Sequence, residues 1–90
     1  MKRKFANGQK TYDLTRDHLT YFFKDGKVKA AGAYRNDKME GEWKFYRITG
    51  DLWQVGNFEN GDKHGSWIRY DKNGKPETEV KFEKGKKLKS

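Results

Sequence analysis

Residues 43–70, WKFYRITGDLWQVGNFENGDKHGSWIRY, decide the fold of this chain because they begin and end on the same pattern. A Trp-x-x-Tyr motif opens at Trp43 and recurs at Trp67, a step of 24 residues. Between the two copies lie a turn at Gly50 and a glycine-rich turn over residues 60–65. A fixed step of this length is typical of proteins built from stacked units, each packed against its neighbours. The stretch therefore predicts a tandem repeat.

The step of 24 recurs across most of the chain and defines columns of equivalent positions. The apolar and aromatic columns are Leu19, Trp43 and Trp67; Phe22, Tyr46 and Tyr70; and Tyr34, Phe58 and Phe82. The glycine columns are Gly26, Gly50 and Gly74, and Gly41 with Gly65. These intervals predict a single domain over residues 1–90, with a degenerate unit at 1–18, full units at 19–42 and 43–66, and a truncated unit at 67–90.

Short apolar runs between turn signals predict strands. Asn7-Gly8 and Asp25-Gly26 are favoured hairpin dipeptides, and we expect Asn7-Gly8 to form a type I′ turn because both residues tolerate positive φ. Apolar residues do not recur at the spacing of a helix face, so helix is disfavoured. We expect strands at residues 11–14, 19–23, 28–34, 42–47, 52–59, 66–71 and 75–83, with longer loops at 35–41 and 60–65. This order predicts an all-β, antiparallel meander.

Two positions bear on the geometry of the sheet. The columns of Leu19 and Phe22 are three residues apart, which places them on opposite faces of a regular strand. Either a β-bulge intervenes, or both faces of the sheet carry aromatic side chains. Pro76 stands in the column of Val28 and Leu52 but cannot donate a backbone hydrogen bond. We therefore expect the last strand to be an edge strand, or to begin at Pro76.

The composition fits a thin sheet. The chain is 32% hydrophobic and 38% charged, so we expect no thick two-layer core. Aromatic residues reach 16%, and these rings are expected to supply most of the buried area. The absence of cysteine excludes disulfides and thiolate metal sites.

The charge makes phosphate-rich partners a candidate class. The formal net charge is +8, although 13 acidic residues are scattered among the 21 basic ones, as on an ordinary mixed-charge surface. No apolar stretch approaches the roughly 18 residues that span a bilayer. The basic start MKRK does not lead into the apolar segment of a signal peptide. We therefore expect a cytoplasmic protein, and a monomer because both ends are strongly charged.

The sequence NGDKHGSWIRY at residues 60–70, followed by DKNGK, resembles the MORN repeat in its bacterial variant. The resemblance covers roughly residues 19–87. It implies β-hairpins stacked into a single elongated, twisted antiparallel sheet. The sequence departs from the pattern at Asp37, which stands where the next unit has Gly61, and at Val80, which replaces the strand glycine of earlier units. The resemblance further implies a scaffold, a protein-interaction module, a contact for anionic membranes, or an antitoxin or immunity partner of a toxin.

No constellation in the sequence predicts catalysis or a metal site. His18 and His64 are both expected in turns, and neither belongs to a three-ligand zinc pattern. Ser66 lies close to His64, but no acid is placed to orient the imidazole. The turn at Asp71 lacks the further acidic positions of a calcium loop. We predict no enzyme, no metal, no cofactor and no small-molecule substrate. The turn aspartates are expected to bond nearby backbone amides: Asp25, Asp51 and Asp71.

Trp53 is the strongest candidate for a binding contact. Its counterparts in the repeat, Lys29 and Glu77, are polar, so we expect Trp53 on the polar face of its strand. The basic residues expected near rings are Arg47, Arg69, Lys44 and Lys81. Two functions remain open: a non-catalytic module that binds another protein, and an electrostatic binder of lipid head groups or nucleic acid. The same rings and cations are also compatible with simple packing in the core.

Overall fold

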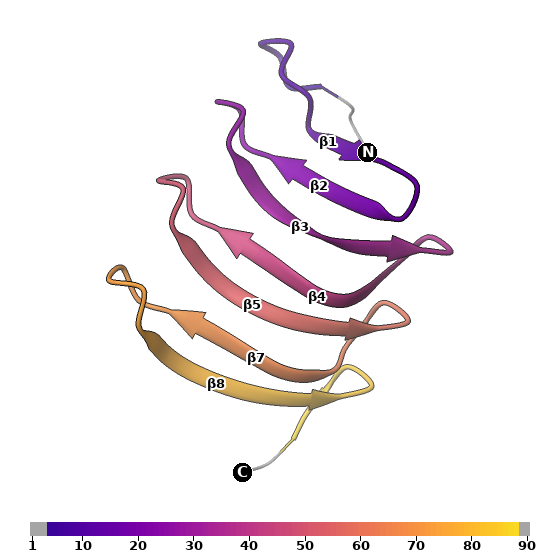
Figure 1. Cartoon of the computed structure of the whole chain (residues 1–90), viewed down its shortest axis with the longest axis vertical. Coiled ribbons are helices and arrows are strands. Elements are labelled where there is room, and N and C mark those ends of the chain that lie inside the picture. The colour runs from indigo at the N-terminus through magenta and orange to yellow at the C-terminus, as the bar shows by residue number, and fades with distance from the viewer. Residues whose placement is uncertain (1–3, 89–90) are drawn as a thin grey trace.

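Successive hairpins lie side by side in one curved antiparallel sheet, with the two ends of the chain at opposite ends of the sheet (Figure 1). This computed structural model describes residues 4–88, so the outermost parts of the first and last predicted units, residues 1–3 and 89–90, lie outside the described residues. The strands are β1 (Tyr12–Leu14), β2 (His18–Phe22), β3 (Val28–Arg35), β4 (Lys38–Tyr46), β5 (Leu52–Glu59), β6 (Asp62–Lys63), β7 (Gly65–Tyr70), β8 (Pro76–Glu83) and β9 (Lys86–Lys87).

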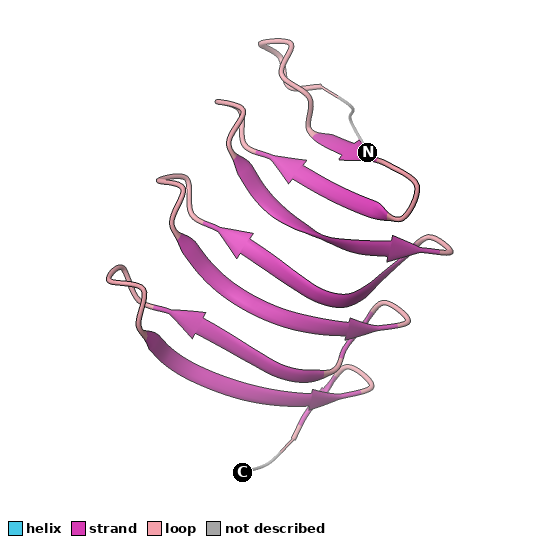
Figure 2. Ribbon diagram, viewed as in Figure 1, coloured by secondary structure: helices cyan, strands magenta, loops and turns pink. Residues whose placement is uncertain are grey.

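The predicted all-β meander is confirmed. The strand order is β1-β2-β3-β4-β5-β7-β8-β9, with the short β6 also paired to β5. The described part of the chain contains no helix (Figure 2), and therefore none that could cross a membrane. The last long strand begins at Pro76, as predicted, so the missing N–H costs the ladder little.

The sheet forms a single layer. Its extents are 44 × 35 × 18 Å, and only four hydrophobic side chains in the described residues are buried: Leu19, Ala30, Trp43 and Trp67. No second sheet or helix covers either face, so aromatic side chains provide most of the buried apolar area.

One end of the sheet carries three-residue turns that close on a glycine. The Phe23 N–H donates to the Lys27 carbonyl at 2.8 Å, and the Gly26 N–H donates to the Phe23 carbonyl at 3.0 Å. This pattern is a type I turn followed by a glycine bulge, and Gly26 has φ +91°. The same two bonds recur over residues 5–9, 47–51 and 71–75. The predicted type I′ turn at Asn7-Gly8 is therefore wrong, because only the glycine of that pair has positive φ.

The opposite end carries two-residue turns in which both residues have positive φ. The φ values are +51° and +64° at Asn36-Asp37, +52° and +85° at Asn60-Gly61, and +50° and +84° at Lys84-Gly85. Asn and Asp tolerate this left-handed conformation, so Asp37 makes the tight turn that a glycine makes one unit later. The loops predicted at 35–41 and 60–65 are therefore wrong, because strand pairing continues almost to the turn residues. After β8 the chain turns at Lys84-Gly85, and β9 pairs back onto β8.

The first hairpin is a shortened copy of those that follow. Its glycine turn at residues 5–9 precedes the next one, at 23–27, by 18 residues rather than 24. Tyr12 pairs with Tyr21 as Ala30 pairs with Phe45 one unit later. The first hairpin lacks six residues that, in the later units, form the two-residue turn and the strand ends beside it. A short polar turn therefore joins β1 and β2. His18, which was expected in this turn, is instead the first residue of β2.

Each buried Trp lies against a glycine of a neighbouring strand. A Cβ atom built on Gly56 would lie 2.2 Å from the Trp67 ring, and one on Gly32 would lie 2.4 Å from the Trp43 ring. Each indole also donates a hydrogen bond of 2.9 Å, from Trp43 Nε1 to the Ala33 carbonyl and from Trp67 Nε1 to the Asn57 carbonyl. The strand glycines are therefore required by the rings that cover them.

The rings form a continuous ladder on one face, which we call the aromatic face: the face that carries Leu19, Trp43 and Trp67. Phe58 stands edge-on between the two tryptophans, with ring centroids 6.1 Å from Trp43 and 5.0 Å from Trp67. Phe82 continues the ladder at 6.2 Å from Trp67. Such pairs contribute about 0.5–1.5 kcal/mol each beyond the area they bury. The first and third apolar columns predicted from the sequence therefore share this face.

The second alternative for the second column is correct, because both faces carry aromatic side chains. The register shifts between Tyr21 and Phe22, and again between Phe45 and Tyr46, but the extra residue of each bulge, Lys29 or Trp53, lies on the partner strand. Beyond the bulge, Tyr46 lines a hollow with residues that alternate away from the aromatic face. We call this opposite side of the sheet the reverse face. It carries the second aromatic column.

Replacing Gly56 with alanine is expected to lower the free energy of unfolding by about 1–3 kcal/mol, because the added methyl must displace the Trp67 ring. Leu19 shows that leucine fits this column, so the cost of Gly56→Ala should shrink in a Trp67→Leu background. Urea unfolding of the four proteins measures both values. An equal cost of the alanine in the two backgrounds would contradict the role assigned to the ring.

Candidate binding surface

Strand pairing places three basic side chains on the aromatic face. Lys63 pairs with Phe58, and Lys87 pairs with Phe82. Arg69 pairs with Gln54, which in turn pairs with Phe45 of the aromatic ladder. Directly opposed residues of an antiparallel pair lie on the same face. All three basic residues are solvent-exposed.

Two of these basic groups lie directly over rings. Lys63 Nζ is 4.8 Å from the Trp67 ring centroid and 5.0 Å from that of Phe82. The Arg69 guanidinium carbon is 5.5 Å from the Trp53 ring centroid. Cations at these distances are attracted to the ring face, by about 0.5–1 kcal/mol at exposed sites. The charged ends of Lys63 and Arg69 thus lie over rings, although both residues are solvent-exposed.

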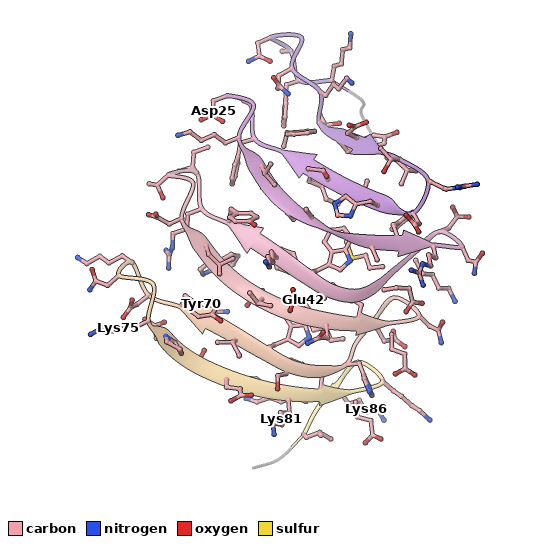
Figure 3. The ribbon with its side chains drawn as sticks, in the orientation of Figure 1. Asp25, Glu42, Tyr70, Lys75, Lys81 and Lys86 are labelled. Carbon is pink, nitrogen blue, oxygen red and sulfur yellow. The ribbon has the colours of Figure 1, made fainter. Side chains whose placement is uncertain are left out.

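The carboxylates lie on the reverse face wherever strand pairing places them. Their pairs are Asp13 with Thr20, Glu40 with Ala33, Glu42 with Asn57, Glu59 with Asp62, Glu79 with Ile68, and Glu83 with Lys86. Glu77 falls in a bulge and has no partner in the register. Lys44, Lys81 and Lys86 share the reverse face with these acids; Glu42, Lys81 and Lys86 are labelled in Figure 3. The reverse face is therefore of mixed charge, whereas the aromatic face carries cations among its rings.

Trp53 does not lie on the polar face of its strand, where the alternation of side chains predicted it. Phe45 pairs with Gln54 and Tyr46 with Leu52, so Trp53 falls in the bulge between them and escapes the alternation. Its ring is half-buried beside Arg69 of the aromatic face. The structure thus brings together two of the five residues chosen from the sequence.

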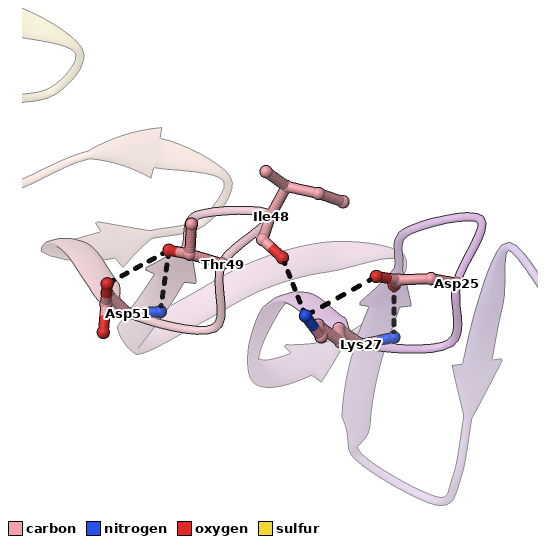
Figure 4. Close-up of polar contacts among 5 residues, drawn as sticks. All are labelled: Asp25, Lys27, Ile48, Thr49 and Asp51. Carbon is pink, nitrogen blue, oxygen red and sulfur yellow. Dashed lines mark hydrogen bonds and ion pairs between the residues drawn. The ribbon is translucent and has the colours of Figure 1, made fainter.

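Arg47 has a structural contact instead. Its Nη2 donates to the Tyr70 carbonyl at 2.9 Å, and its buried Nε has no hydrogen-bond partner. Neighbouring glycine turns are linked in the same way elsewhere, since Lys27 Nζ donates to the Ile48 carbonyl at 3.3 Å and also lies 3.8 Å from Asp25 (Figure 4). Arg47 therefore holds adjacent hairpins together. The remaining two candidates, Lys44 and Lys81, are exposed on the reverse face.

Lys63 and Lys87 were not chosen from the sequence, although a signal was present. They are one repeat step apart, in the column that begins with Met39. Met39 packs against the buried cluster of Leu19, Ala30 and Trp43. The column therefore marks side chains that cover the ring ladder, and two of its three members are basic.

The reverse face holds open hollows beneath the glycine turns. The larger has a volume of about 660 Å³, and its lining residues are Thr20, Gly26, Lys27, Val28, Ala31, Tyr46 and Gly50. A smaller one of about 300 Å³ lies one unit further along, beside Tyr70 and Leu52. The small residues of β3 make the first hollow larger, because Ala31 stands where Val55 stands in the next unit.

The residues weighed for catalysis have separate partners. His64 Nε2 lies 3.2 Å from a Glu59 carboxylate oxygen, whereas the Ser66 hydroxyl donates to Glu79 at 2.8 Å. Residues 4–88 contain no cluster of three or more histidine or acidic side chains able to hold a metal ion.

The turn aspartates largely behave as predicted. Asp71 Oδ1 accepts the amides of Asn73 at 2.9 Å and Lys75 at 3.0 Å, and Asp25 Oδ1 accepts the amide of Lys27 at 2.9 Å. The prediction for Asp51 is wrong, because its carboxylate accepts the Thr49 hydroxyl at 3.1 Å (Figure 4).

The third unit matches a known repeat family. The family described as MORN repeat variant matches residues 63–84, which run from the end of β6 to the turn after β8. Residues 63–84 are therefore a MORN repeat. The matched segment contains Lys63, Trp67 and Arg69, so this repeat supplies much of the aromatic face. No curated protein and no solved structure gave a significant match to the chain.

Burial raises the pKa of Tyr21 above its ordinary value of 10.0, and the charges of Tyr34 and Tyr12 add to the rise. The folded state therefore favours the neutral phenol. The stability that this supplies is fully present below pH 10 and is lost as the pH rises through the raised pKa.

We expect the free energy of unfolding to fall less steeply above pH 10 in Tyr21→Phe than in the parent. Urea titrations from pH 8 to 11 measure the two slopes, with Tyr70→Phe on the reverse face as control. Parallel slopes for the parent and Tyr21→Phe would contradict the expectation.

Proposed function

We propose that this protein is a non-catalytic module that binds another protein through its aromatic face. The observation that supports the proposal best is the Trp53–Arg69 pair, a half-buried ring beneath an exposed guanidinium on a face with no covering layer. Trp and Arg are the residue types most enriched among side chains that dominate binding energy. Their contact orders both side chains before a partner arrives, which lowers the entropy lost on binding.

The size of the sheet supports the same proposal. Its outline of 44 × 35 Å corresponds to roughly 1,500 Å² on each face. A standard protein interface needs about 800 Å² from each partner. One face is therefore large enough for a stable complex, and its half-buried rings offer apolar area that a partner can remove from water.

A scaffold or antitoxin-like role is the narrower form of this proposal. It rests on the resemblance to MORN-repeat proteins with such roles. A toxin encoded beside this protein, and bound by it, would support the antitoxin form. If the partner is instead an assembly of several proteins, the scaffold form is supported.

Replacing Trp53 or Arg69 with alanine is expected to weaken partner binding by at least about 10-fold, as loss of a central interface side chain does. The test is capture from extract of the source cell at moderate salt, followed by titration of the recovered protein against each variant. Lys44→Ala on the reverse face is the matched control and should bind as the parent does. Recovery of no partner, or equal loss in the control, would contradict the proposal.

Binding to anionic phosphate surfaces is the second candidate. The exposure of Lys63, Arg69 and Lys87 on one face favours it. If these three cations neutralise three phosphates of a single strand, affinity should fall roughly 20-fold between 50 and 200 mM salt. Titration of an oligonucleotide and of anionic vesicles over this range measures the fall. Absence of binding at 50 mM salt would exclude this candidate.

A further inference from the structure

The two faces of the sheet differ in charge in a way that identifies the chemistry of a partner. In the described part of the chain, pairing places Lys63, Arg69 and Lys87 on the aromatic face and no carboxylate, while Glu77 lies in a bulge outside the register. Within residues 4–88, the ion pairs are Lys27 with Asp25 and His64 with Glu59. None of the three cations on the aromatic face therefore has a carboxylate within contact distance. Their charge is available to a ligand.

We propose that the aromatic face binds an acidic segment of a partner protein, in which apolar side chains alternate with carboxylates. The inference rests on the proposed function and deepens it by naming the surface and the partner chemistry. The apolar side chains would cover the half-buried rings of Phe45, Phe58 and Phe82. The carboxylates would reach the cations that stand among those rings.

The spacing of the cations fits an extended segment. Lys63 pairs with Phe58 and Arg69 with Gln54, and these partners are four residues apart on β5, which corresponds to roughly 13 Å in extended chain. Lys87 lies beyond the adjacent strand β8, roughly 10 Å to the side of Lys63 at ordinary strand spacing. An extended segment of about five residues spans the longer distance.

The ring geometry favours a protein segment over a nucleic acid. Stacking of bases needs free ring faces. Here Phe58 meets both tryptophans edge-on, at interplanar angles of 86° and 89°, and Lys63 stands over Trp67 and Phe82. Access to the ring faces is thus limited, whereas apolar side chains can contact exposed ring edges without displacing anything.

The test uses the full chain and a labelled twelve-residue peptide in which glutamates alternate with leucine, phenylalanine and serine. The control peptide has glutamine in place of each glutamate. One variant carries Lys63→Met, Arg69→Gln and Lys87→Gln; methionine is the residue of this column in the preceding unit and keeps the rings covered. The matched variant carries Lys44→Gln, Lys81→Gln and Lys86→Gln, which remove the same net charge from the reverse face.

Fluorescence anisotropy should show binding of the acidic peptide and at least about 10-fold weaker binding of the control peptide, as expected for three exposed charge pairs of about 0.5 kcal/mol each. The aromatic-face variant should lose a similar factor, and the reverse-face variant less than about 2-fold. Lys86 and Lys87 are adjacent residues on opposite faces, so the single variant Lys87→Gln should weaken peptide binding more than Lys86→Gln does. Urea midpoints close to that of the parent establish that each variant is folded.

Equal loss in the two triple variants would overturn the inference, because net charge alone would then explain binding. Tighter, face-dependent binding of oligo(dT) or of phosphatidylserine vesicles would also overturn it, in favour of a phosphate ligand. A partner captured from cells that still binds the aromatic-face variant would overturn this inference and leave the proposed function standing. Capture of no partner would instead count against the proposed function, while the peptide titration would still decide the chemistry of the face.

Discussion

The sheet depends on the contact between each Trp ring and a glycine of the neighbouring strand. Trp43 and Trp67 are buried because Gly32 and Gly56 have no side chain beneath them, and each indole N–H donates to a backbone carbonyl. In a single-layer sheet no second layer can bury a large side chain, so burial must come from neighbours on the same face. The repeat step of 24 follows from this constraint, because every ring needs the same glycine and the same turn lengths on either side of it.

The same constraint leaves the molecule with two chemically different surfaces. The ring ladder uses one face, and the side chains that cover it are long ones: Met39 in one unit and Lys63 and Lys87 in the next two. Lysine can cover a ring with its methylenes and keep its charge in water. Cations therefore gather on the aromatic face as part of its packing, whereas the carboxylates that strand pairing places lie on the reverse face. A surface suited to an anionic, partly apolar partner thus arises from the way in which the core is built.

The turns show where local sequence is informative and where it is not. Glycine turns such as that at Gly26 were predicted in the right places, since a positive φ at the end of a hairpin is strongly selective for glycine. The type assigned to Asn7-Gly8 was wrong because a dipeptide does not reveal the bulge that follows it. The loop predicted around Asp37 was wrong because a polar residue can adopt the left-handed conformation when the flanking strands pair closely. Trp53 left its predicted face because one bulged residue breaks the alternation on which that prediction depended.

The sequence by itself determined the repeat, the strands, the antiparallel order and the columns of rings, because these follow from local spacing and from the side-chain period of a strand. The tertiary structure alone decided which charges share a face. Arg69 stacks on Trp53 and Lys63 stands over Trp67 only because bulges and strand register bring them together, and the same arrangement lets the Arg47 guanidinium donate to the Tyr70 carbonyl of the next hairpin. A shift of one residue exchanges the two faces of a strand, and register is set by pairing between strands rather than by any one strand's sequence.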